Sequence, residues 1–251
     1  MSIPLSISKS GMNAVQNAMD ALSNDIANTN TTGYKSKNVS FSELLINDIN
    51  GDSVPLSDRA QNSGINNGTK SGVTTTNMTQ GAFVSDENDY HLAIAGDGFF
   101  GVTDKNNQFY LTRDGAFQVN GDKSITNSHG DRLSIETIIT TEQWPDGDVS
   151  IAQNGEVRIQ TENGSSLVGR IPLYTPAISD ALMPAGENKY TYDGEFTEGN
   201  GTIQQHFLET SNVDLASAIT DMMVAQRAYS LNTKVAQGTN EMMSMINQFK
   251  Q

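Results

Sequence analysis

The sequence predicts an α+β protein in which helices at the two ends of the chain pair in a coiled-coil-like inner domain, with a mainly antiparallel β domain between them. Three observations support this fold class. Apolar residues recur every seven positions near both termini, and short alternating runs separated by turn residues fill the middle. Almost all of the net charge of −14 also lies between the two ends. The 251 residues suffice for one large or two modest domains.

The first expected element is a helix that starts near the N-terminus. Small residues lie beside its apolar stripe, as in a helix that packs closely on a partner. We expect it to stop near Asn28, with Gly33 as a C-terminal cap because glycine readily adopts the left-handed conformation. The stripe consists of Leu5, Met12, Val15, Met19, Leu22 and Ile26.

The last expected element is a second helix, within residues 211–251. We expect Ser211 to open it as a variant capping box, with Asp214 complementing the helix dipole. Gln226 and Arg227 are candidate contacts between subunits, because charge is scarce on this helix. Its apolar positions are Leu215, Ile219, Met222, Tyr229, Ala236 and Met243, flanked by Val235, Met242, Ile246 and Phe249.

Both terminal segments carry few charges for solvated helices. Residues 1–30 contain three charged side chains and residues 211–251 contain six. Because removing charges from water is costly, weakly charged flanks favour helices that neighbours cover on several sides. We therefore expect the two ends to pair with each other, with other subunits, or with both.

The middle of the chain divides into two parts. Residues 47–80 are rich in Asn, Gly, Ser and Thr, and we expect residues 35–80 to form an extended linker or arm. Residues 81–210 predict a β-rich outer domain, and residues 1–34 with 211–251 a discontinuous helical domain. Tight hairpins are expected at the turn residues, which are 105–107, Asn120-Gly121, Asn154-Gly155 and Asn163-Gly164.

Residues 96–101, GDGFFG, match the glycine pattern of a dinucleotide-binding loop. That chemistry requires a helix after the glycines, whereas the following residues read as another strand. We therefore interpret Gly96 and Gly98 as a bend and expect Phe99 or Phe100 to enter the core. Gly101 is expected to let the next strand approach closely. No catalytic, cofactor-binding or metal motif is recognisable, so we expect no enzyme activity and no cofactor.

The composition also bears on partners and location. The acidic balance disfavours nucleic acid, and no apolar run is long enough for membrane insertion. The N-terminus lacks the pattern of a cleaved signal peptide, so a protein that leaves the cytoplasm would need another route.

Four stretches, in order, resemble the bacterial flagellar basal-body rod protein family of rod and hook axial proteins. They are NDIANTNTTGYK (24–35), AIAGDGFF (93–100), YLTRDGAFQVN (110–120) and ETSNVDLASAITDMMVAQRAY (209–229), which together span nearly the whole chain. The resemblance is greatest to the distal rod type, and next to the proximal rod type. Asp25 stands where the family commonly has Asn, and Ser217-Ala218 replace residues that are often acidic.

The resemblance implies a structural subunit of the basal-body rod that transmits torque from motor to hook. It implies assembly with copies of itself and other axial proteins, including hook protein, and export by the flagellar type III apparatus. Asn28, Gly33, Tyr34 and Lys35 would form an elbow leaving the first helix. The apolar stripe of the first helix would pack against Met222, Tyr229, Val235, Met243 and Ile246. The helices would become ordered when a neighbouring subunit covers them. A proximal-rod or short hook-type subunit, a secreted ligand-binding β-domain and a hydrolase with dispersed carboxylates remain alternatives.

Overall fold

The structure, a computed structural model, describes residues 3–43, 68–140, 143–162, 164–177 and 182–249. The chain separates into two compact units. The first, here called the helical unit, contains residues 1–27, 37–77 and 214–251. The second, the β-rich unit, contains residues 28–36 and 78–213. Residues 28–34, predicted to belong with the terminal helices, therefore lie in the β-rich unit.

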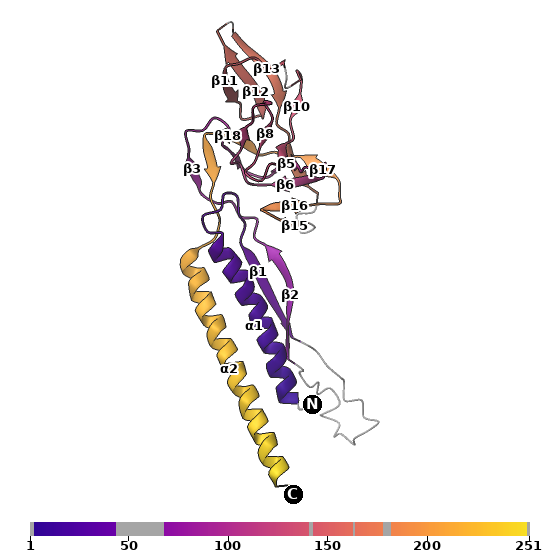
Figure 1. The fold of residues 1–251 in the computed structure, drawn as a ribbon, viewed down its shortest axis with the longest axis vertical. Coiled ribbons are helices and arrows are strands. Elements are labelled where there is room, and N and C mark those ends of the chain that lie inside the picture. Colours follow the sequence, from indigo (N-terminus) through magenta and orange to yellow (C-terminus); the bar gives the residue numbers. More distant parts are fainter. Residues whose placement is uncertain (1–2, 44–67, 141–142, 163, 178–181, 250–251) are drawn as a thin grey trace. The chain divides into compact units, whose positions relative to one another are not determined.

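Both expected helices are present in the helical unit. Helix α1 (Ile3–Ala27) and helix α2 (Leu215–Gln248) lie side by side and run in opposite directions (Figure 1). The Thr233 hydroxyl is 3.6 Å from the Met12 sulfur. A Cβ added at Gly11 would lie 3.1 Å from the Asn232 side-chain nitrogen, so this glycine lets the helices approach closely. The coiled-coil geometry of the pair remains a prediction.

A two-stranded antiparallel sheet packs on α1. Strands β1 (Lys37–Glu43) and β2 (Thr69–Thr76) pair with each other. The Asn17 amide donates to the Ser71 hydroxyl at 2.7 Å, and the Ser10 hydroxyl accepts the Thr69 N–H at 3.3 Å.

These two strands differ from the extended linker expected over residues 35–80. The β-branched run VTTT favours a strand, but the surrounding Asn, Gly and Ser obscured it in the sequence. The central part of that expected linker, residues 44–67, lies outside the described residues.

The β-rich unit consists of antiparallel strands, as predicted. Among the described residues, one four-stranded sheet has the order β10 (Glu136–Thr137), β13 (Gly164–Arg170), β12 (Glu156–Thr161), β11 (Asp148–Ile151). Two further pairs are β4 (Leu92–Ala95) with β18 (Thr202–Gln205) and β3 (Phe83–Ser85) with β19 (Phe207–Glu209).

The largest sheet within the described ranges has nine strands. Its main path is β15 (Met183–Gly186), β16 (Lys189–Thr191), β6 (Phe109–Thr112), β5 (Phe99–Thr103), β9 (Arg132–Leu133), β8 (Ile125–Thr126), β7 (Gln118–Val119). Strand β14 (Leu173–Pro176) pairs with both β5 and β17 (Phe196–Glu198).

The predicted tight turns account for several of these strand connections. Asn154-Gly155 joins β11 to β12, and Gly155 has φ +85°. Asn120-Gly121 joins β7 to β8, and residues 105–107 join β5 to β6 with Asn107 at φ +63°. Asn163 lies outside the described residues.

One apolar core unites the sheets of this unit. Phe100 is fully buried and meets Phe117 edge-on, with ring centroids 5.4 Å apart. Strands of the four-stranded sheet, the nine-stranded sheet and the β4–β18 pair all contribute. Representative members are Leu92, Ile94, Val102, Val157, Val168 and Ile203.

We expect Phe100→Ala to lower the free energy of unfolding of the β-rich unit by about 3–5 kcal/mol, because it leaves a cavity among rigid strands. Phe207→Ala serves as the matched control, since Phe207 is 36% exposed. Urea unfolding of both variants measures the difference. Equal losses for the two would contradict this description of the core.

Candidate assembly helix and buried ionic cluster

Helix α2 begins with a side-chain cap at Asp214. One carboxylate oxygen accepts the N–H groups of Ala216 at 3.0 Å and Ser217 at 3.3 Å. The other accepts the Ser217 hydroxyl at 2.8 Å. The expectation that Ser211 caps the helix is wrong, because the N-cap is Asp214, three residues later. The Ser211 hydroxyl accepts the Val213 N–H, which lies before the first helical residue, Leu215.

One face of α2 forms the seam with α1 and follows alternating steps of four and three residues. These seam positions combine small or polar side chains with methionine and tyrosine. Ala218 and Thr239 are buried, and Tyr229 is 38% exposed. The remaining seam positions are half-buried. The full set is Ala218, Met222, Ala225, Tyr229, Asn232, Ala236, Thr239 and Met243.

A second face of α2, here called the outward stripe, follows the same spacing but carries larger apolar side chains. At about 100° per residue, it lies roughly a third of a turn from the seam. Leu231 is 62% exposed and Val235 is 53% exposed. Ala228 and Gly238 complete the spacing. The large members of the outward stripe are Val224, Leu231, Val235, Met242, Met245 and Phe249.

The structure places the predicted helix residues on different surfaces. The apolar stripe of α1, from Leu5 to Ile26, is half-buried. Val235 and Ile246 were expected to pack on the first helix, but both are more than half exposed. Val235 falls outside the steps of four and three that keep a residue on the seam, whereas Ile246 continues those steps from Met243 and is exposed near the C-terminal end of α2.

The remaining predicted residues of α2 are also exposed. They include two apolar side chains near the start of the helix and the two candidate contact residues. They are Leu215, Ile219, Gln226 and Arg227.

The elbow residues belong to the β-rich unit and adopt a turn. Helix α1 ends at Ala27, so Gly33 is too far along the chain to be its C-terminal cap, and that expectation is wrong. Gly33 has φ +64°, and a Cβ there would lie 2.4 Å from the Arg113 carbonyl. Asn28 begins the turn, because its carbonyl accepts the Thr31 N–H at 3.1 Å. Tyr34 is buried.

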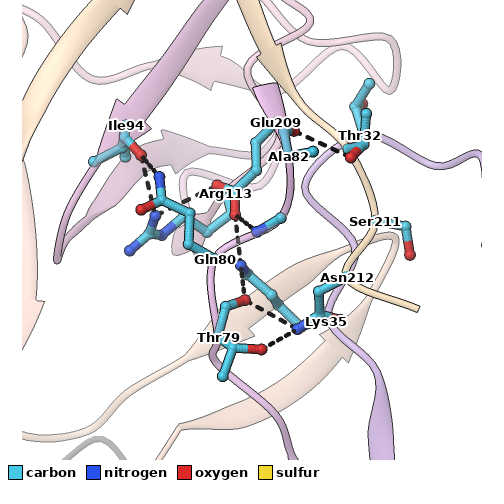
Figure 2. Close-up of polar contacts among 12 residues, drawn as sticks. Thr32, Lys35, Thr79, Gln80, Ala82, Ile94, Arg113, Glu209, Ser211 and Asn212 are labelled. Carbon is cyan, nitrogen blue, oxygen red and sulfur yellow. Dashed lines mark hydrogen bonds and ion pairs between the residues drawn. The ribbon is translucent and has the colours of Figure 1, made fainter. Parts of the chain in front are cut away.

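Lys35 leads into a buried ionic cluster (Figure 2). Its ammonium lies 2.6 Å from a Glu209 carboxylate oxygen and donates to the Thr79 carbonyl at 2.7 Å. The same Glu209 oxygen accepts the Gly81 N–H at 2.8 Å. The other oxygen is 3.4 Å from the Arg113 guanidinium. All three charged side chains are 7% exposed or less.

The electrostatics of this site follow from its burial. Loss of solvation lowers the pKa of the Lys35 ammonium and the pKa of the Arg113 guanidinium, while the Glu209 carboxylate opposes both shifts. Arg113 is further held by the Gly96 carbonyl, which accepts from it at 2.8 Å, and by the Phe99 ring. Two cations thus share one carboxylate in a site with little water access.

The GDGFFG segment is a bend between strands, without a following helix. Gly96 and Gly98 have φ +97° and +135°, a region that favours glycine. Phe99 and Phe100 are both buried, in two neighbouring clusters. Gly101 was expected to admit a neighbouring strand. Instead, it makes room for aromatic rings, since a Cβ there would lie 2.6 Å from Tyr174 and 2.7 Å from Phe109.

Sequence reasoning missed Glu209 and Arg113 as partners of Lys35. The three residues are far apart along the chain, so the sequence does not show that they meet. The one indication was weak: Glu209 follows two apolar residues in the segment HFLET (206–210). It also missed a role for Asp25, which is 4% exposed and accepts the Lys37 N–H with both oxygens, at 3.1 and 3.2 Å. This contact fixes the start of β1 against α1.

Other kinds of site were sought in the same residues. In the part of the chain that the structure describes, no three His, Cys, Asp or Glu side chains gather as a metal site would require. Neither described helix is long and apolar enough to cross a bilayer.

Comparison with known proteins places three family profiles on the chain. The profile "Flagella basal body rod protein" matches residues 5–35. "Flagellar hook protein FlgE/F/G D1 domain" matches residues 93–159, and "Flagellar basal body rod FlgEFG protein C-terminal" matches residues 204–249.

Curated relatives align over almost the full length. The flagellar basal-body rod protein FlgG of Borreliella burgdorferi is 30% identical, covering 96% of each chain. FlgG of Agrobacterium fabrum is 30% identical, covering 96% of this chain and 97% of the relative. The flagellar hook-basal body complex protein FlhP of Bacillus subtilis is 25% identical, with 94% and 95% covered.

The chain is a structural protein and not an enzyme, because the relatives it matches are named as flagellar rod proteins. The chain belongs to the flagellar basal-body rod protein family.

The cap of α2 gives a pH-dependent prediction. Hydrogen bonds from the Ser217 hydroxyl, then from backbone N–H groups, lower the pKa of Asp214. The cap therefore contributes fully above the unfolded pKa of about 3.9 and is lost as the pH falls through the lower folded value. Amide exchange at Ala216 and Ser217 should accelerate over that acidic range beyond its intrinsic pH dependence.

Asp214→Asn is the matched control, because Asn also caps helices but does not titrate. It should keep both amides protected at neutral pH and remove the additional acid dependence. Asp214→Ala should expose both amides at every pH. An unchanged acid dependence in Asp214→Asn would show that another group controls the first turn.

Proposed function

We propose that this chain is a structural subunit of the bacterial flagellar basal-body rod that assembles through its terminal helices into a helical tube. In this role it transmits torque from the motor to the hook. Family membership supports the rod assignment. The observation that carries the assembly mechanism is the outward stripe of α2.

The outward stripe favours contact with a further helix. Its large side chains are half or more exposed, whereas the seam that α2 forms with α1 uses Ala218, Ala225, Asn232 and Thr239. Burying the larger apolar side chains stabilises contact by about 25 cal/mol for each Å² removed from water. No charged residue interrupts the stripe between Val224 and Phe249. The more apolar face of α2 is thus the one that its own α1 leaves exposed.

Open assembly is the geometry that such a face favours. Because the subunit's own α1 already covers the seam, we propose that the outward stripe packs on a different surface of the neighbouring subunit, which makes the contact an unlike one. Repetition of an unlike contact that does not close on itself generates a helical filament. We propose the same helical contacts with other flagellar axial proteins, including other rod proteins and hook protein.

Location and export follow from the rod assignment. We propose a place in the basal body outside the cytoplasm, reached through the flagellar type III export apparatus without a cleaved signal peptide. The acidic β-rich residues 81–210 would form the solvated outer part of the subunit. The alternative within the family is a proximal-rod or short hook-type subunit. A relative named as a hook-basal body complex protein supports this alternative.

We predict that Leu231→Glu combined with Val235→Glu weakens self-association of the purified chain at least about tenfold. A carboxylate buried in an apolar contact without a partner costs more than the 1.4 kcal/mol to which that factor corresponds. Both residues are exposed in the single chain, so the variant should keep its helix content. Sedimentation velocity over a range of concentrations measures association, and circular dichroism measures the fold.

Gln237→Glu combined with Asn240→Asp is the matched control, since both residues are exposed on another face of α2 and the two substitutions add the same two negative charges. The self-association of this control should be closer to that of the wild-type chain than to that of the stripe variant. Association that the stripe variant leaves unchanged, or a wild-type chain that stays monomeric at all concentrations, would contradict assembly through this stripe.

Ordering of the helices on assembly is a separate prediction. In the dilute chain, we expect the amides of α1 and α2 to exchange much faster than those of the buried strand β12, because the seam is small and polar and joins distant parts of the sequence. Protection should rise when subunits associate. Strong protection of both helices in the monomer would show that they fold independently of assembly.

A further inference from the structure

The segments that connect the two units meet at one carboxylate. The chain passes between units at residues 27/28, 36/37, 77/78 and 213/214. Three of these passages adjoin short stretches of the β-rich unit, here called the crossing segments: residues 33–36, 79–82 and 209–212. Each crossing segment hydrogen-bonds the other two within that unit, as Figure 2 shows in part.

Side chains make the central links. Glu209 binds Lys35 from the first crossing segment and the Gly81 N–H from the second. Asn212 accepts the Ser36 N–H at 2.7 Å and donates to the Thr79 carbonyl at 2.9 Å. The polar contacts of Lys35 and Asn212 thus converge on the same carbonyl.

Backbone groups repeat two of these connections, those of residues 209–212 with each of the other two crossing segments. The Gly33 N–H donates to the Glu209 carbonyl at 2.8 Å, and the Thr210 N–H donates to the Ala82 carbonyl at 2.8 Å. The Asn212 N–H donates to the Tyr34 carbonyl at 3.3 Å. Every crossing segment is therefore held by both side-chain and main-chain bonds.

A buried ion pair such as Lys35–Glu209 fixes the geometry of its partners more than it stabilises the fold. Replacing a buried ion pair with apolar residues is often neutral or stabilising, whereas removing one partner is strongly destabilising. Charge-assisted bonds are directional, so Lys35 and Glu209 restrict how the three segments lie relative to one another. An apolar contact of the same size would permit sliding.

A single strand between two units transmits twist poorly, because rotation about its φ and ψ angles relieves the strain. Segments fixed to one another lose that independent rotation. We propose that the cluster of Lys35, Glu209, Arg113 and Asn212 joins the three crossing segments into one rigid group, through which torque passes between the units. This inference rests on the proposed rod function.

The test uses amide exchange of the purified full-length chain in low, non-denaturing concentrations of urea. Amides of Gly33, Ser36, Gly81, Thr210 and Asn212 report the three crossing segments. If the cluster couples them, they open in one reaction, with the same free energy of opening and the same urea dependence. Segments that open separately would overturn the proposal.

Variants sharpen this test. Glu209→Gln and Lys35→Met should each accelerate exchange in all three crossing segments by about tenfold or more, since each removes a charge from a buried pair. Glu198→Gln is the matched control, because Glu198 pairs with Arg170 on the exposed surface of the same unit. Acceleration confined to the segment that carries the substitution, or equal acceleration by the control, would contradict coupling. Should both cluster variants fail to fold, the proposal is decided by whether the three crossing segments of the wild-type chain open with the same free energy and the same urea dependence.

A second readout addresses torque. In flagellated cells that depend on this chain, Glu209→Gln should reduce swimming most at high viscosity, whereas Glu198→Gln should swim like wild type. Full motility of Glu209→Gln under load, together with coupled exchange, would overturn the torque role while leaving the coupling. A wild-type chain that does not enter the flagellum would instead refute the proposed function, and the exchange result would still stand.

Discussion

Because α1 and α2 come from opposite ends of the sequence and pack side by side, the chain between them must leave and return at nearby points. The β-rich unit meets this requirement with a hydrogen-bonded junction in which the 33–36 stretch contacts the 209–212 stretch directly. Closing so long a loop costs conformational entropy, which favourable contacts have to offset. The buried Lys35–Glu209 pair is placed where that closure occurs.

The two apolar faces of α2 contrast in composition. The seam toward α1 contains Asn232 and Thr239, and Gly11 admits a close approach there. Polar residues at such positions fix the register of paired helices at some cost in stability. The outward stripe has larger side chains and greater exposure. A modest contact within the subunit and a more apolar surface for neighbours together suit a chain whose helices gain order on assembly.

Much of the fold was predictable because it depends on local patterns. Seven-residue spacing gave both helices, and Asn-Gly pairs with alternating runs gave antiparallel strands and their turns. The position of the α2 cap was wrong by three residues, since both Ser211 and Asp214 are good capping residues and only the helix geometry selects between them.

What could not be predicted depends on residues that are distant in sequence. Lys35 was identified as part of a motif, but its partners Glu209 and Arg113 meet it only through sheet pairing. The faces of α2 posed a related problem, because apolar periodicity marks candidate positions without saying which of them α1 covers. Val235 was therefore predicted for the seam and lies on the outward stripe.

Electron cryomicroscopy of purified basal bodies or of polymers formed by this chain tests the account most directly. The account predicts a rod in which the outward stripe of α2, including Leu231, Val235 and Met242, packs against a helix of a neighbouring subunit. A rod in which those side chains remain solvent-exposed, or in which neighbours meet through the β-rich unit alone, would contradict it.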